Sequence, residues 1–259
     1  MGSLPAERKV LLFTAGQVPL ALRLSQVREI VALPGDATEV TFRGAVVPAL
    51  PVAVALGLPA GPTRFALVTE AVPALALRVE AVHGIIDLSA AEVFQLPTRT
   101  LLPQPAPFQG AVVSGGTIAL ELVVPALGWA PMEPAGELPG PPPELDFPAG
   151  RELLFTRGAR TYAAPIQLLA QVLEGPAVFP VPLTPSAHRG LLYHGRAIHP
   201  VFDVPILYRE PAPEGASTAL LIEAGGHAIA VLADRILPAG DAPGREVSRP
   251  SWDLIFAGA

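Results

Sequence analysis

The sequence of 259 residues is long enough for two domains of ordinary size, and 51% of its residues are hydrophobic while only 15% are charged. Such a chain can bury a sizeable core, and its formal net charge of −6 disfavours a nucleic-acid-binding surface, which needs clustered Lys and Arg. Because the chain has no cysteine, disulfide frameworks, thiolate nucleophiles and cysteine-based zinc sites are excluded.

The 24 Gly and 32 Pro residues predict many turns and few long helices. Two stretches without charged residues, 44–63 and 100–120, are each interrupted by Pro and Gly. We therefore interpret them as buried strands and turns rather than membrane spans. Residues 1–10 have no apolar signal core, so we expect a cytoplasmic protein.

The first half of the chain is predicted to be mainly β-structure. Lys9–Gly16 forms a first strand, and the alternating leucines of 20–24 predict a second. The apolar residues of Val27–Val31 have the spacing of a short helical turn. The later predicted elements are a hairpin at Phe42–Leu50, strands at Phe65–Glu70 and Ala74–Val82, a short capping-box helix at Ser89–Glu92 and a strand at Thr117–Val123.

The second half repeats the first. The sequence Leu-Leu-Phe-Thr-x-Gly of residues 11–16 returns at 153–158 and again leads into an alternating strand. The blocks that follow it in the second copy are an apolar turn at 168–172, a Gly-Pro hairpin within Pro182–Val204 and strands at Ala219–Glu223 and Ala228–Ile236. Four matched blocks in the same order indicate a duplicated domain.

The predicted organisation is a domain at 7–130, a linker at 131–149 and a second domain at 150–259. The linker is rich in Pro, Gly and Glu and is expected to be a semi-rigid spacer. The second domain is truncated in its C-terminal part, because little sequence follows Ile236. An open edge left by the missing part would be filled by the first copy or by a second chain, so a homodimer is one expectation.

Several motifs stand at matched places along the chain. They are Leu12-Phe13-Thr14-x-Gly16, Val27-Arg28-Glu29-Ile30, Arg43-Gly44-x-Val46-Val47-Pro48, Thr184-Pro185-x-x-x-Arg189-Gly190, Pro200-Val201-x-Asp203 and Leu232-Ala233-Asp234-Arg235-Ile236. Together they resemble the CheW-like domain of bacterial chemotaxis coupling proteins. The resemblance covers nearly the whole chain apart from the linker and the C-terminal end.

The resemblance implies an all-β fold with a few short helices. Two tandem CheW-like domains would each be built from paired small five-stranded β-barrels, with the second copy incomplete. It also implies an adaptor with no catalytic residues, metal or cofactor. Such an adaptor would bridge the cytoplasmic tips of chemoreceptors and the regulatory domain of the histidine kinase CheA.

The resemblance further implies which residues bind partners. The family's Glu in the Val-x-Glu-Ile motif pairs with the Arg of the Arg-Gly step, which here gives Glu29 and Arg43. In copy two Gln171 replaces the acid and Gly195-Arg196 replaces Arg-Gly, so we expect that pair to be lost. The predicted partner-binding residues are Val27, Glu29, Ile30, Val31, Arg43, Gly44, Arg189 and Gly190.

Other kinds of site are weaker interpretations of the sequence. His188, His194 and His199 lie close together, but in a regular strand His199 points away from the other two. Asp203 and Asp234 each end a strand, where capping is an ordinary role. Ser114 lacks the preceding Gly of a nucleophile elbow, and Trp129, Trp252 and Phe256 are expected to pack in the core or between domains.

Two alternative functions stay open at this point. One is a β-barrel protein that binds a small ligand or carries out hydrolysis in a cleft near His199 and Asp203. The other is a duplicated domain that has lost receptor binding and serves another kinase pathway or a structural role.

Overall fold

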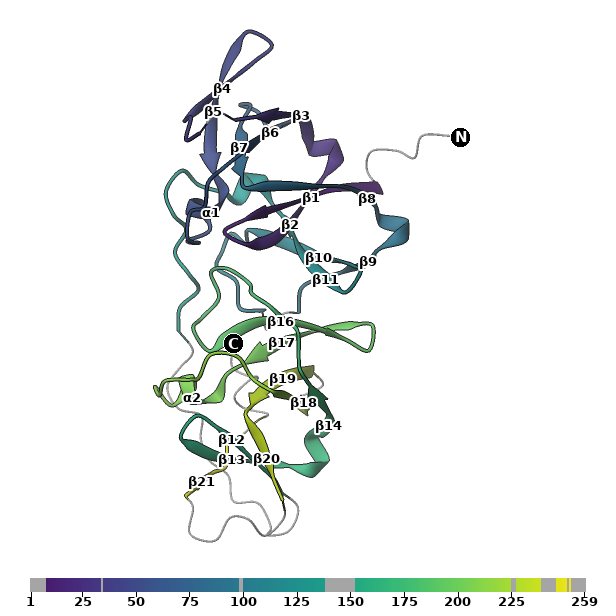
Figure 1. Cartoon of the computed structure of the whole chain (residues 1–259), viewed down its shortest axis with the longest axis vertical. Coiled ribbons are helices and arrows are strands. Elements are labelled where there is room, and N and C mark those ends of the chain that lie inside the picture. Colours follow the sequence, from purple (N-terminus) through teal and green to yellow (C-terminus); the bar gives the residue numbers. More distant parts are fainter. Residues whose placement is uncertain are drawn as a thin grey trace. The chain divides into compact units, whose positions relative to one another are not determined.

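The computed structural model describes residues 8–33, 35–97, 100–137, 152–224, 227–238, 246–250 and 252. These residues form two compact units (Figure 1). Unit 1 contains the chain up to Leu96, Leu102–Ala135 and the short segment Val181–Leu183, and unit 2 contains the remainder. The predicted linker residues 138–149 and the segment after Trp252 lie outside the described residues.

The first sheet of unit 1 is built on the predicted Leu-Leu-Phe-Thr-x-Gly strand. In spatial order its strands are β8 (Ala81–Asp87), β1 (Lys9–Ala15), β2 (Val18–Arg23), β11 (Thr117–Leu122), β10 (Phe108–Ser114) and β9 (Glu92–Phe94). Successive side chains of a strand point to opposite faces of the sheet. Phe13 and Leu20, which are paired across β1 and β2, are both fully buried in the core. β11 lies parallel to β2, with Leu120 opposite Leu20. The predicted strand at Thr117–Val123 is therefore confirmed.

The second sheet of unit 1 has five strands. In spatial order they are β3 (Val27–Ala32), β6 (Phe65–Thr69), β7 (Ala76–Val79), β5 (Ala45–Pro51) and β4 (Glu39–Phe42). The short helix α1 (Val52–Ala55) follows β5, which lies parallel to β7. Val47, Ala66 and Val68 are buried in the core of this sheet.

Unit 2 repeats this second sheet. In spatial order its strands are β14 (Leu169–Glu174), β18 (Thr218–Ala224), β19 (His227–Ala233), β17 (Ala197–Phe202), β16 (His188–His194) and β15 (Val178–Phe179). The helix α2 (Val204–Leu207) follows β17, and β17 lies parallel to β19, as β5 does to β7. The duplicated all-β architecture with few short helices is confirmed.

Within the part of unit 2 that the structure describes, the other sheet has four strands where unit 1 has six, in agreement with the predicted incompleteness of copy two. In spatial order they are β20 (Arg235–Leu237), β12 (Glu152–Arg157), β13 (Arg160–Pro165) and β21 (Val247–Ser248). β21 lies parallel to β13 with Ser248 opposite Tyr162, as Leu120 lies opposite Leu20 in unit 1. The two-residue β21 thus takes the place of β11.

Like β21, Trp252 occupies space that strands fill in unit 1. Its side chain is fully buried, with its ring 6.2 Å from that of Phe155. Its indole N–H donates to the carbonyl of Ala163 on β13 at 3.2 Å. The C-terminal segment of the same chain therefore fills part of the space that β9–β11 occupy in unit 1, and the prediction of a buried Trp252 is confirmed.

Two predicted helical elements differ from the structure. The apolar turn at Val27–Val31 is the strand β3, and the matching turn of copy two lies mainly in β14, because pairing with β6 and β18 outweighs the local spacing. A 3-10 turn precedes each of these strands: η2 (Leu24–Gln26) and η6 (Ile166–Leu168). A third 3-10 turn, η5 (Val124–Ala126), follows β11.

The predicted helix at Ser89–Glu92 is instead the 3-10 turn η3 (Leu88–Ala90). Its cap is Asp87, whose carboxylate accepts from the backbone N–H of Ser89 at 2.9 Å. The Ser89 hydroxyl donates to the same carboxylate oxygen at 2.8 Å, so it does not cap the turn itself. The capping-box prediction placed the cap two residues too late.

Two further predictions concern the end of copy one. Trp129 is 62% exposed, so it is not part of a domain core, and its alternative placement between the domains stays a prediction. The first residues of the predicted spacer are held by unit 1, since the N–H groups of Met132 and Ala135 donate to the carbonyls of Ala55 and Leu183 at 2.9 and 2.8 Å. Among the described residues, no helix is long and apolar enough to cross a membrane.

Candidate partner-binding surfaces

β3 is an exposed edge strand of unit 1 and carries four of the predicted partner-binding residues. It is hydrogen bonded to β6 on one side and lies last in the strand order of its sheet. Ile30 is 39% exposed and Glu29 is also exposed, while Val27 and Val31 are half-buried. An edge strand of this kind offers unpaired backbone groups beside an apolar side chain.

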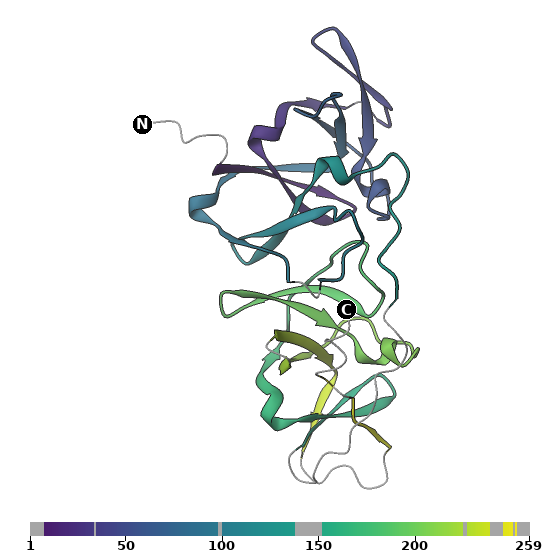
Figure 2. The ribbon, with the colours of Figure 1, turned by 180° about the vertical axis from the view of Figure 1, so that it is seen from behind.

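The turn between β4 and β5 carries the other two predicted residues of copy one. Arg43 and Gly44 both have positive φ, 50° and 79°, which is the pattern of a tight type I′ hairpin turn. The hairpin extends beyond the rest of its sheet (Figures 1 and 2). The Arg43 guanidinium lies 5.0 Å from the ring centre of Phe42, and Val46 beside the turn is 63% exposed. The hairpin therefore presents a cation and an apolar side chain to solvent.

The ion pair inferred between Glu29 and Arg43 is not formed. β3 and β4 lie at opposite ends of the strand order, and neither of these two side chains makes an ion pair with any described residue. Next to Glu29, Arg28 pairs with Glu70 at 2.7 Å. The prediction of the pair was wrong because the sequence motif does not report which strands are neighbours in the sheet.

At the matching positions of copy two, a different contact replaces the ion pair. Gln171 on β14 stands where copy one has Glu29, and its amide oxygen is 2.9 Å from the His194 imidazole Nε2, within hydrogen-bond distance. β14 is the first and β16 the fifth strand in the order of this sheet, so the contact links two non-adjacent strands. An ion pair was not expected here, and the contact between Gln171 and His194 stands in its place.

Gly190 is required by the packing of copy two. Its φ is +136°, and a Cβ at this position would overlap the carbonyl oxygen of Phe179 on β15. β15 is paired to β16 at Phe179–Leu191, next to this glycine. Gly190 thus allows β15 to cover the edge of β16, so its contribution to any binding surface is through the backbone.

Asp203 lies in a buried ionic cluster rather than acting as a helix cap. Its two carboxylate oxygens accept from Nε and Nη2 of Arg157 at 2.8 and 2.7 Å, and both side chains are fully buried. It forms no side-chain cap bond to α2. The role predicted from its position after a strand is therefore wrong.

The remaining donors of Arg157 are also used. They bind the Asp234 carboxylate at 2.6 Å and the carbonyls of Gly215 and Pro213 at 2.6 and 2.8 Å. Burial alone would lower the pKa of Arg157, but its hydrogen bonds to Asp203 and Asp234 outweigh burial and raise the pKa above its ordinary value. Arg157 is therefore a fully charged, fully bonded buried cation.

Sequence reasoning missed Arg157. The signal was present in the aligned copies, since Arg157 and Asp203 stand where copy one has Ala15 and Pro51. Copy two thus has a cation and an anion at two positions where copy one has uncharged residues. Such a coupled change indicates a contact between the two residues.

The alternative site near His199 and Asp203 does not form. Nε2 of His199 is 3.4 Å from the carbonyl of His194, and both oxygens of Asp203 are bound to Arg157. Burial lowers the pKa of His199. Within the part of the chain that the structure describes, no three His, Cys, Asp or Glu side chains gather as a metal site would require.

His188, the third histidine considered, is a core residue. It lies edge-on to Phe202 with ring centres 5.1 Å apart, and neither ring nitrogen has a hydrogen-bond partner among the described residues. Burial lowers its pKa to about 4. It is therefore neutral at pH 7.

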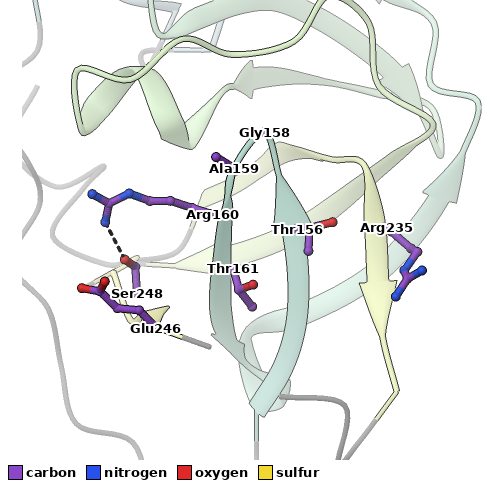
Figure 3. Close-up of a pocket in the computed structure, with 8 residues that line it drawn as sticks. All are labelled: Thr156, Gly158, Ala159, Arg160, Thr161, Arg235, Glu246 and Ser248. Carbon is purple, nitrogen blue, oxygen red and sulfur yellow. Dashed lines mark hydrogen bonds between the residues drawn. The ribbon is translucent and has the colours of Figure 1, made fainter. Parts of the chain in front are cut away.

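A polar cavity of about 610 Å³ lies on the four-stranded sheet of unit 2 (Figure 3). Thr156, Thr161 and Arg235 stand on neighbouring strands there, and Arg160 lies near the turn. The guanidinium of Arg160 reaches to the Ser248 hydroxyl at 3.1 Å, whereas Arg235 points to the other side. The two cations do not converge, so they do not form a compact anion site.

The fold and these surfaces define a class of protein: a tandem β-structure with exposed strand edges. A family model for the CheW-like domain matches residues 9–128 and 152–251, and the chain belongs to this family. No curated protein matches the chain. Among solved structures, it is similar to the scaffolding protein TtCheW from Thermoanaerobacter tengcongensis, with 16% identity and a TM-score of 0.38 over 45% of this chain and 89% of that one.

Proposed function

We propose that this chain is a non-catalytic cytoplasmic scaffold that couples chemoreceptor tips to the regulatory domain of a CheA-type histidine kinase. Its membership of the CheW-like family supports a role in chemotaxis-type signalling. The observation that carries the proposal is the edge strand β3, which presents Ile30 beside an unpaired backbone edge. Exposed strand edges and apolar side chains are a common means of protein recognition.

Copy one supplies most of the proposed contacts. Val27, Glu29, Ile30 and Val31 lie on β3, and the Arg43–Gly44 turn stands at the other end of the strand order of the same sheet. We propose that the β3 edge makes the central apolar contact and that Arg43 makes a peripheral charged one. Apolar contacts at the centre of an interface contribute most of the affinity, and peripheral charges mainly affect association rates.

The experiment is a binding measurement with the full chain, a purified receptor cytoplasmic fragment and the kinase regulatory domain from the same cell. Ile30→Asp places a charge on the proposed contact and is expected to weaken binding to at least one of these proteins by about tenfold or more. Because Ile30 is exposed, the melting temperature is expected to stay close to that of the wild type.

Ile85→Asp is the matched control. Ile85 is 51% exposed on β8, in the other sheet of unit 1, and is not among the predicted contacts. It is expected to bind as the wild type does. Equal losses for the two variants, or no binding by the wild-type chain, would contradict the proposal.

The other functions are less well supported. A hydrolase or ligand cleft near His199 and Asp203 would need these side chains to be directed at one space, and each is bonded elsewhere. A homodimer stays a prediction. Its original reason, an open edge in copy two, is weakened where β21 and Trp252 fill that edge within one chain.

A further inference from the structure

A groove of about 360 Å³ lies entirely within unit 2. Its apolar surface includes Val178 of β15 and Leu232 of β19, and Arg189 of β16 supplies its charged group. The loop before β18 forms another side with Gly215 and Ala216. Copy one lacks the segment that contains β15 and Arg189, so the groove is a property of the second copy.

The buried cluster described above fixes the surroundings of this groove. Arg157 binds the carbonyls of Pro213 and Gly215, which holds the loop in place. It also binds both oxygens of Asp203. Gly190, next to Arg189, permits the close approach of β15. The residues that distinguish copy two from copy one therefore contribute to the same local structure.

The guanidinium of Arg189 has hydrogen-bond donors available to a ligand in this groove. Its Nε forms a long ion pair with Oδ2 of Asp203 at 3.9 Å, beyond hydrogen-bond distance, and both oxygens of Asp203 already accept hydrogen bonds from Arg157. The Arg189 side chain is 36% exposed and donates no hydrogen bond to any described residue. The described residues that line the groove include no acidic side chain.

We propose that this groove binds a protein segment that carries an Asp or Glu side chain next to an apolar one. A guanidinium presents its donors in a planar fork that matches a carboxylate, and the apolar surface of Val178 and Leu232 accepts the neighbouring side chain. This inference rests on the proposed scaffold function and adds the chemistry of one partner contact. The second copy thus recognises charge, whereas β3 of the first presents an apolar edge.

The test uses the full chain and overlapping peptides that together cover the receptor tip and the kinase regulatory domain. Binding is measured by fluorescence anisotropy at low and physiological salt. At least one peptide with an acidic residue beside an apolar one is expected to bind. Arg189→Glu is expected to weaken that binding by about 10- to 100-fold, and replacement of the peptide's carboxylate by an amide should have a similar effect.

Two further variants make the result specific. Arg189→Lys keeps the charge but not the fork and is expected to retain part of the affinity. Arg235→Glu makes the same charge change at an exposed position on β20, in the other sheet of unit 2, and is expected to bind as the wild type does. Melting curves of all variants show whether each is folded.

The outcomes separate this inference from the proposed function. If the whole partner proteins bind the wild-type chain and Arg189→Glu equally well, or no acidic peptide binds, the groove assignment is overturned and the scaffold function stands. If Arg235→Glu weakens peptide binding as much as Arg189→Glu, the effect is one of overall charge and the groove assignment is also overturned. If the wild-type chain binds neither whole protein, the scaffold function and this inference are both overturned.

Discussion

The two copies share a fold but differ in charge at two of the three positions that form a buried cluster in copy two. Copy two has Arg157, Asp203 and Asp234, which are joined in one cluster. Copy one has Ala15, Pro51 and Glu80 at the matching places of the aligned repeats. Only the acid at the third position is shared, and both the buried cation and its main partner are present in copy two and absent from copy one.

The conserved acid shows what the fold itself needs. Glu80 accepts from the backbone N–H of Gly16 at 2.9 Å, and Asp234 accepts from that of Gly158 at 2.8 Å. Both contacts hold the turn of the Leu-Leu-Phe-Thr-x-Gly hairpin. The Arg157–Asp203 pair is an addition to this shared contact, so the comparison separates what forms the domain from what is particular to copy two.

The largest expected effect comes from breaking this pair on one side. Arg157→Met leaves the carboxylate of Asp203 buried without its cation, which is expected to lower the free energy of unfolding by about 3–5 kcal/mol. Chemical denaturation of the full chain measures it. The double variant Arg157→Met, Asp203→Leu is expected to recover most of the loss, because an apolar pair makes no unpaired charge. A double variant as unstable as the single one would show that the cluster is not a coupled pair.

His188 gives a pH-dependent difference between the copies, since it lies in the segment that copy one lacks. Its pKa falls from 6.5 to about 4 on burial, so between these pH values the unfolded chain binds more protons than the folded one. The free energy of unfolding therefore falls as the pH falls through this window, by about 3 kcal/mol from this residue at full protonation.

His188→Leu removes this pH-dependent contribution to the free energy of unfolding. The measurement is the difference in unfolding free energy between wild type and variant from pH 7 to pH 4, which cancels the shared titration of the carboxylates. We expect the variant to gain relative stability as the pH falls. A difference that does not change with pH would contradict a buried neutral histidine.

Two glycines with positive φ test the role of β15. Gly190→Ala is expected to destabilise the chain by about 2 kcal/mol, because the new methyl group meets the backbone of Phe179. Gly44→Ala, where a Cβ meets nothing within 4 Å, adds only the strain of a left-handed backbone, about 1 kcal/mol. Thermal unfolding compares them, and equal losses would mean that the close approach of β15 is not the reason for Gly190.

The smallest expected change in stability is at Arg43. Its recorded side-chain contact is with Phe42, so Arg43→Ala is expected to lower the unfolding free energy by less than about 1 kcal/mol. We expect it to weaken a receptor pull-down more than it lowers the melting temperature. If receptor binding and melting temperature fall to the same extent, Arg43 contributes to folding and not to a binding surface.

Much of the fold could be predicted from the sequence because alternation and duplication are local patterns. The hairpins at Leu11–Leu24 and their copies follow from period-two burial, and the short second copy follows from the missing blocks. The turn at Val27–Val31 was mistaken for a helix because its pairing with β6 comes from residues about 40 positions away.

The candidate site was less predictable for a related reason. The Glu29–Arg43 pair was transferred from a motif, but strand order decides which side chains meet, and β3 and β4 lie at opposite ends of their sheet's strand order. Arg157 and Asp203 are 46 residues apart, and Asp203 alone has the sequence position of a helix cap. Only the comparison of the two copies signals that they change together.

We propose that the two copies of one fold bind partners through different surfaces. The decisive measurement is a titration of the full chain, Ile30→Asp, Arg189→Glu and the double variant with the receptor fragment and the kinase regulatory domain. We predict that each single variant weakens binding and that the losses in binding free energy add in the double variant, because the two residues lie in different units. Wild-type affinity in either single variant would contradict this proposal.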